Sequence, residues 1–329
     1  MLQRGFATER GKDHQVWVYS KDQPPRQTVT RKFGMEKFFY GPENSQADRN
    51  ITRYENDNQS TIQQLRLLPN GEKVDSEFSA TLISHLEVRS AFLREEMVTS
   101  FKKGMSGLGS ILQKPDQLRT LYKKYLEANP EELEAFLRRN FIPDNKKAQA
   151  KRLIDAALDN MSDEAISASM GPAASMLRAL TQTISEVAKD AQNRVLAENA
   201  SGHVRMNLYR NFTYRIFRPN SGQLILPDTT LCFTKVGGAA PFAQERDTLE
   251  GVVLPLSSSV AIVGSKSEET SFNLKTLNRL LAACSFKSFI AKNDEKEFRS
   301  LSGRIGKYAK LIDDKVLDFT VEDLDLSQK

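Results

Sequence analysis

The stretch that most constrains this chain runs from residue 75 to residue 203, where helical patterns follow one another without a strand-like segment. Phe78, Leu82 and Leu86 lie close to one stripe of a helix that we expect between Asp75 and Gly104. Further apolar stripes follow, with breakers such as Gly171-Pro172 between them. This middle section therefore predicts a helical subdomain, and any strands must come from the residues before and after it.

Both ends of the chain have the composition of β-structure. Residues 14–21, HQVWVYSK, alternate in polarity and are rich in β-formers, so they predict a strand. Residues 210–235 and 250–266 each predict a hairpin, with turns at NSG and SSS. Residues 274–291 predict one helix.

This order of elements predicts an α+β protein. We expect the strands of the N-terminal region to join the C-terminal strands in one antiparallel sheet, with the helical subdomain inserted between them. The expected regions are 1–74, 75–203 and 204–329, of which the first and the third form one domain.

Composition narrows the class of protein. Charged residues make up 27% and hydrophobic residues 39%, and no apolar run reaches the ~18–20 residues of a membrane span. The first residues lack the features of a secretory signal. Cys232 and Cys284 cannot form a disulfide framework, so we expect a cytoplasmic protein without a membrane partner.

Common catalytic signatures are missing from the sequence. It contains no GxxxxGK[ST] or GxGxxG phosphate loop, no GxSxG turn and no HExxH pair. Whether the chain is an enzyme therefore depends on isolated polar residues in apolar surroundings.

A basic and aromatic stretch offers one candidate site. Four arginines alternate with tyrosines and phenylalanines along a predicted strand: Arg205, Arg210, Arg215 and Arg218. Arginine binds phosphates and aromatic rings stack on bases, and the net charge of +5 permits contact with nucleic acid. The alternative is a strand with one solvated basic face.

Three residues of the predicted helices offer a second candidate. His85 and Arg89 are four residues apart, so they share one helix face, where they could bind an anion or orient a carboxylate. Glu55 lies at the edge of an apolar stripe and could be a general base or a metal ligand. The alternative is a structural pair within one helix or between two helices, with Glu55 or Glu87 as the partner, or, for Glu55, a solvated position.

Asp228 stands between two apolar runs in QLILPDTTLCF. With Thr229 and Thr230 beside it, it could bind a divalent cation at a strand end, and it could equally form a turn.

Several segments together resemble a bacterial and fungal family known as domain of unknown function 4238. They are LQRGFATERGKDHQVWVYSKD, EKFFYGPE, YENDNQSTIQQL, HLEVRSAFLRE, QLILPDTTL and EGVVLPLSSSVAIVG. The family's His-x-x-Pro stretch is not in this sequence, and Pro227 and Thr230 depart from its turn. The resemblance implies a shared fold. Glu55, Arg89 and Asp228 match characteristic positions of the family, which implies that the three residues belong to one site.

Two functional hypotheses follow. In the first, Glu55, His85, Arg89 and Asp228 form one polar pocket of a metal-dependent hydrolase that acts on nucleic acid or another phosphate-bearing substrate, in host defence or as a toxin. Glu55 and Asp228 would hold Mg²⁺ or Mn²⁺, and Arg89 would stabilise phosphate charge. In the second, the chain is a non-catalytic interaction module that binds a protein partner through its helical region. Sequence-specific DNA binding ranks last, because no recognition helix is evident.

Overall fold

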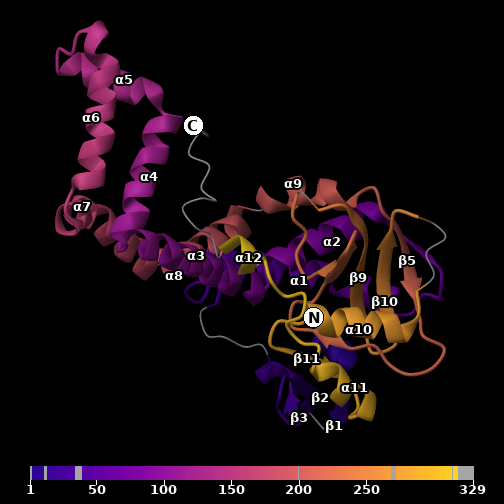
Figure 1. Ribbon diagram of the computed structural model, residues 1–329. Coiled ribbons are helices and arrows are strands. Elements are labelled where there is room, and N and C mark those ends of the chain that lie inside the picture. Colours follow the sequence, from indigo (N-terminus) through magenta and orange to yellow (C-terminus); the bar gives the residue numbers. More distant parts are fainter. Residues whose placement is uncertain are drawn as a thin grey trace. The chain divides into compact units, whose positions relative to one another are not determined.

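A computed structural model describes residues 2–10, 13–33, 39–198, 200–245, 247–267, 272–312 and 314–317. Its helices and antiparallel sheets make an α+β fold, as predicted (Figure 1). The chain divides into two compact units. The β-containing unit comprises Met1–Met97 and Val187–Leu311, and the helical unit comprises Val98–Glu186 with the described residues from Ile312 onward.

The helical unit is shorter than the expected region 75–203, because helices at both ends of that region belong to the β-containing unit. The acidic residues 318–329 lie outside the described part of the chain.

One sheet ties the two ends of the chain together. Its strands are β1 (Thr8–Arg10), β2 (Asp13–Ser20), β3 (Arg26–Val29), β6 (Leu226–Pro227) and β11 (Ser288–Ala291). Their order is β1-β2-β11-β6, and β3 also pairs with β2. Tyr19 of β2 stacks on Phe289 of β11, with 5.0 Å between ring centroids. The N-terminal strands therefore pair with C-terminal strands, as expected.

A second sheet corrects the expectation of a single one. Its strands are β4 (Lys73–Val74), β5 (Thr213–Phe217), β7 (Cys232–Lys235), β8 (Gly238–Ala240), β9 (Leu249–Ser257) and β10 (Val260–Ser265). Their order is β4-β5-β10-β9-β7-β8. The β9–β10 hairpin is confirmed. The hairpin predicted over 210–235 is wrong, because β5 pairs with β4 and β10 instead.

Helices complete the β-containing unit. They are α1 (Gln46–Leu65), α2 (Ser76–Val88), α9 (Ala200–Tyr209), α10 (Leu274–Cys284) and α11 (Lys296–Ser302), with short 3-10 turns η1 (Gln3–Phe6) and η2 (Thr30–Lys32). Asp75 caps α2 by accepting a hydrogen bond from the Phe78 N–H at 2.7 Å, and α2 packs against α9. The predicted helix 274–291 is wrong beyond Cys284, where Ser285 adopts an extended conformation ahead of β11.

The helical unit is a succession of helices. They are α3 (Ala91–Leu112), α4 (Pro115–Ala128), α5 (Pro130–Arg139), η3 (Asp144–Lys146), α6 (Lys147–Asn160), α7 (Asp163–Ser169), α8 (Gly171–Glu198) and α12 (Asp314–Leu317). The expected single helix 75–104 is two helices, since α2 ends at Arg89 and α3 runs through Gly104. Both α3 and α8 begin or end in the β-containing unit. Among the described residues, no helix has the length and apolar character that a bilayer span requires.

Buried apolar side chains are concentrated in the β-containing unit, whose main core joins both sheets to α1, α2, α9, α10 and α11. Cys232 of β7 and Cys284 of α10 are fully buried in it as free thiols, with their sulfur atoms 3.2 Å apart.

Candidate functional site

Three of the four residues predicted to form a polar pocket contact one another. Arg89, at the end of α2, donates from Nη2 to Glu55 Oε1 of α1 at 2.8 Å. His85 Nε2 lies 3.5 Å from Arg89 Nη1, one helical turn earlier on α2. The His85 ring stacks on Tyr54, with 3.8 Å between ring centroids. The contact between α1 and α2 therefore creates a small polar cluster.

The charges of this cluster follow from its burial. Burial and the neighbouring Arg89 guanidinium lower the pKa of His85 to about 3. Burial alone would raise the pKa of Glu55, but the Arg89 charge holds that pKa below its usual value. At neutral pH the cluster is an ion pair beside an uncharged imidazole. Since a general base works best with a pKa near the operating pH, His85 is poorly matched to that role.

Arg89 is held on all sides of its guanidinium group. Nη2 donates to Glu55, Nε donates to the Tyr40 hydroxyl at 3.4 Å, and Nη1 lies against His85. An anion that approached Arg89 would have to compete with these partners, so the geometry favours the structural alternative stated for this pair.

Asp228 lies in a different environment. Its carboxylate accepts the backbone N–H groups of Phe286, Lys287 and Ser288 at 2.7, 2.7 and 2.9 Å, and its own N–H donates to the Ser288 carbonyl. The Thr230 N–H donates to the Pro227 carbonyl, which closes a turn. Asp228 therefore secures the segment between α10 and β11 from the end of β6. Its carboxylate acts as a structural acceptor.

The two predicted metal ligands have different partners, Arg89 for Glu55 and the backbone N–H groups of residues 286–288 for Asp228. Within the described part of the chain, no hydrogen bond or ion pair joins Asp228 to Glu55, His85 or Arg89. Nor do His, Cys, Asp and Glu side chains gather there in any group of three that could hold a metal ion. Three of the four predicted pocket residues thus contact one another, whereas Asp228 has hydrogen-bond partners of its own.

The predicted row of arginines is divided among different elements. Arg205 belongs to helix α9 and not to a strand, because α9 continues to Tyr209. It donates two hydrogen bonds to Glu87 of α2, from Nε at 2.7 Å and from Nη2 at 2.6 Å. The Glu87 side chain is 0% exposed and also accepts from the Tyr209 hydroxyl and the Ala243 N–H. Arg205 is therefore part of a buried structural network.

The other three arginines contact the protein as well. Arg210 pairs with Glu77 at 2.7 Å, and Arg215 donates to the Gly71 carbonyl. Arg218 donates to the Leu68 and Arg66 carbonyls, which anchors the chain after β5. The nucleic-acid role predicted for these residues has no support in their contacts.

Sequence reasoning missed the network around Glu87. Its signal was present, since Arg205 and Tyr209 are four residues apart and share a face of a helix. The alternation of arginine with aromatic residues favoured a strand instead.

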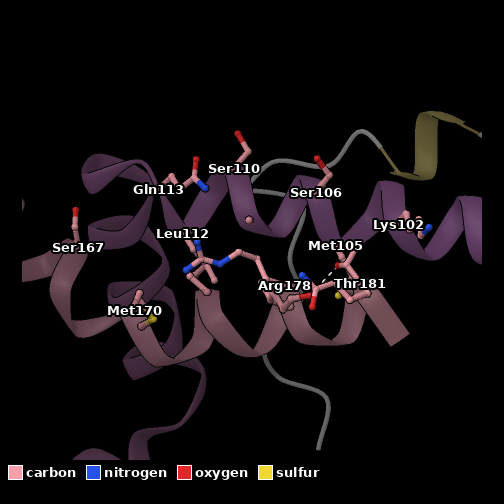
Figure 2. A pocket seen from close by; sticks show the side chains of 15 residues that line it. Lys102, Met105, Ser106, Ser110, Leu112, Gln113, Ser167, Met170, Arg178 and Thr181 are labelled. Carbon is pink, nitrogen blue, oxygen red and sulfur yellow. Dashed lines mark hydrogen bonds between the residues drawn. The ribbon is translucent and has the colours of Figure 1, made fainter. Parts of the chain in front are cut away.

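The helical unit contains a groove that no sequence motif indicated (Figure 2). It has a volume of about 750 Å³ and is lined by α3, α7, α8 and the turn between α7 and α8. Met105 and Leu112 line it from α3, and Met170 and Leu177 line it from the opposite wall. Methionine-lined grooves adapt to apolar side chains of different shapes, which suits binding of a peptide segment.

Large apolar side chains are also exposed on the helical unit. They are Tyr125, Phe136, Phe141, Leu153, Met176, Leu180 and Val316. Phe141 is 92% exposed, and its backbone has φ of 57°, a region that bulky residues rarely adopt. Phe141 directly follows the end of α5, where the Ile142 N–H donates to the Leu137 carbonyl, and its exposed ring makes it a candidate binding residue.

Comparison of this chain with protein families, curated proteins and solved structures gave no match. The resemblance to domain of unknown function 4238 stays a prediction.

Proposed function

We propose that this chain is a non-catalytic interaction module that binds a protein partner through its helical unit. The observation that carries the proposal is the exposure of apolar side chains on α4 to α8, with Phe141 foremost. Single exposed apolar side chains are common on protein surfaces, but each of these would contribute binding free energy when a partner covers it.

The backbone at Phe141 supports the same interpretation. A glycine would adopt φ of 57° without strain, whereas a phenylalanine is held there at a cost in folding free energy. The ring gains little from folding in return, because it is almost fully exposed. A role in binding would account for its presence.

The metal-dependent hydrolase and its Mg²⁺ or Mn²⁺ cofactor stay predictions. Both oxygens of Asp228 accept backbone N–H groups, and Glu55 is paired with Arg89. These contacts give the interaction module the stronger support.

The test is quantitative cross-linking of the tagged full chain in its source cells, followed by mass spectrometry. The Phe141→Ala variant removes the ring, and Leu67→Ala removes another largely exposed apolar side chain, 83% against 92%, from the β-containing unit as a control. We expect specific partners whose recovery falls about tenfold or more in Phe141→Ala, the loss typical of an interface hot spot, and is unchanged in Leu67→Ala.

Two results would overturn the proposal. One is a set of partners that responds equally to both variants. The other is Mg²⁺- or Mn²⁺-dependent cleavage of nucleic acid or a phosphate ester by the purified chain that is lost in Glu55→Gln.

A further inference from the structure

The positive charge of this chain is concentrated where α5 and α6 meet, at one end of the helical unit (Figure 1). Residues 138–152, called the basic segment below, contain six lysines and arginines and one acid, so their formal charge is +5. The whole chain of 329 residues has the same formal charge. Acids and bases therefore balance over the other residues, and the basic segment carries the excess.

This charge is confined to the turn and the helix ends beside it. Glu131 and Glu132 begin α5, and Asp155 and Asp159 follow the basic segment on α6. Asp159 pairs with Lys123 of α4 at 2.6 Å. The acids of the two helices thus lie beyond the basic segment on both sides, and the end where the helices meet stays positive.

Two lysines of the basic segment already have acidic partners. The Lys147 Nζ atom lies 2.7 Å from Asp144 and 2.7 Å from Glu134 of α5, and the Lys151 Nζ atom lies 3.6 Å from Glu134. The four other cations are exposed and form no ion pair with the described residues: Arg138, Arg139, Lys146 and Arg152. These four charges are available to a partner.

The turn also carries Phe141, whose ring is the most exposed large apolar side chain among the described residues. In the sequence Phe141 stands between Arg139 and Lys146. Two more exposed apolar side chains, Phe136 of α5 and Leu153 of α6, stand just outside the two ends of the basic segment. A partner that covers the Phe141 ring must therefore lie against cations as well as apolar groups.

Electrostatics select the chemistry of that partner. A neutral or basic surface over Phe141 would take water away from the neighbouring cations without supplying a compensating charge, which costs free energy. An acidic surface supplies that charge, and it also speeds the encounter through long-range attraction. Charge complementarity thus favours an acidic partner.

The same surface fits a protein better than a nucleic acid or a lipid bilayer. The side chain of Asp144, three residues after Phe141, is 93% exposed. It places a carboxylate among the cations, where it would disfavour a continuous row of phosphates or anionic head groups. Leu153 is aliphatic and offers no ring on which a base could stack. Protein interfaces, by contrast, are enriched in both aromatic residues and arginine.

We propose that the helical unit binds an acidic segment of its protein partner at the basic segment, with the Phe141 ring at the centre of the contact. Aspartate and glutamate side chains of the partner pair with the four available cations, and its apolar side chains cover the ring. This inference rests on the proposed function, because it names the chemistry of the partner at the same site.

The first step of the experiment identifies the partner segment. The photoreactive residue p-benzoylphenylalanine replaces Asn145, an exposed residue of the turn, in the tagged full chain in its source cells. After irradiation, mass spectrometry identifies the captured protein segments. We expect segments in which aspartate and glutamate outnumber lysine and arginine, with a yield that falls about tenfold when Phe141→Ala is added.

The second step measures the role of the cations. Each captured segment is synthesised as a fluorescent peptide, and its Kd for the purified full chain is measured by anisotropy. Lys146→Glu/Arg152→Glu should raise this Kd about tenfold, because two attractive charges become repulsive. The neutral pair Lys146→Gln/Arg152→Gln should raise it less. Higher salt, from about 50 to about 500 mM KCl, should weaken binding to the wild-type chain.

A matched control separates the local charge from the total charge. Lys21→Glu/Arg26→Glu makes the same two changes at exposed positions of the β-containing unit and should leave the Kd unchanged. Far-UV circular dichroism confirms that each variant is folded. Neither Lys146 nor Arg152 forms an ion pair with the described residues, so we expect their replacement to leave the fold intact.

The possible failures can be told apart. A Kd that rises in Phe141→Ala but is the same in wild type and Lys146→Glu/Arg152→Glu would overturn the acidic partner and leave the proposed function standing. Captured segments that do not depend on Phe141 would overturn both. Adducts of nucleotides or lipids in place of protein segments would show that the basic segment binds a different class of partner, which also overturns the proposal.

Discussion

The two units of this chain differ in how they use their apolar residues. In the β-containing unit, side chains such as Leu254, Ile262 and Phe289 are completely or almost completely buried in one core. In the described part of the helical unit, the buried apolar side chains are Ile111, Leu118, Leu137 and Ile166, and more large ones are exposed than buried. The β-containing unit thus holds most of the buried apolar side chains. The helical unit keeps apolar surface available, as regions that bind partners often do.

The polar interactions differ in the same way. The Glu87 carboxylate of the β-containing unit is fully buried and accepts four hydrogen bonds, whereas Glu134 and Lys147, which link α5 to α6 in the helical unit, are both partly exposed. The predictions below test this contrast, beginning with the largest effect.

Glu87→Ala should lower the free energy of unfolding by about 3–5 kcal/mol, because it leaves the Arg205 charge without its buried partner. Urea denaturation measures the change. Tyr209 and Ala243 donate to different oxygens of Glu87, so Glu87→Gln keeps an acceptor for one of them and should lose less. Glu134→Ala, the matched change in the helical unit, should have no measurable effect. An equal loss of unfolding free energy in Glu87→Ala and Glu134→Ala would show that the two ion pairs contribute equally to stability.

Asp228→Ala should lower the free energy of unfolding by about 3 kcal/mol, since three backbone N–H groups lose their acceptor. Thermal melts of wild type and variant, each with and without Mg²⁺ and Mn²⁺, measure this. We expect no cation-dependent rise in either protein. A rise in wild type that disappears in Asp228→Ala would restore the predicted metal site.

Lowering the pH should destabilise the β-containing unit through His85. Its pKa is about 3 in the folded chain and about 6.5 when unfolded, so the unfolded state binds the extra proton between these values. The stabilisation is complete above pH 6.5 and is lost as the pH falls toward 3. Between pH 6.5 and 4.5, wild type should lose about 2 kcal/mol more than His85→Phe, which keeps a ring on Tyr54. Urea denaturation at each pH measures the free energy of unfolding. If it fell equally with pH in wild type and His85→Phe, His85 would not be a buried neutral imidazole.

Phe141→Gly should change the free energy of unfolding least, with a gain between zero and about 1 kcal/mol. Glycine relieves the strained φ but is more flexible in the unfolded chain. Phe141→Ala keeps the strain and serves as the control, with a free energy of unfolding no higher than that of wild type. A clear loss of stability in Phe141→Gly would mean that the ring packs in the fold, and Phe141 would cease to be a binding residue.

Local patterns predicted the parts of the fold that depend on neighbouring residues. The β9–β10 hairpin follows from two apolar runs on either side of SSS, and α5 follows from Pro130 and two acids. The strands that were misassigned depend on distant partners, since β5 pairs with β4 more than a hundred residues earlier in the chain. Spacing on one helix placed His85 beside Arg89. The partners of Asp228 depend on the tertiary structure, because the backbone at 286–288 is about sixty residues away in the sequence. Local spacing could not predict them.

The position of the two cysteines has a practical consequence. Cys232 and Cys284 are the only cysteines of the chain, and both are sealed in the core of the β-containing unit. A thiol reagent can reach them only when that unit opens, so the rate of labelling measures its opening kinetics without any engineered probe. Opening of the helical unit alone would leave the thiols unlabelled. The labelling rate of the native chain therefore measures the opening of the β-containing unit separately from that of the helical unit.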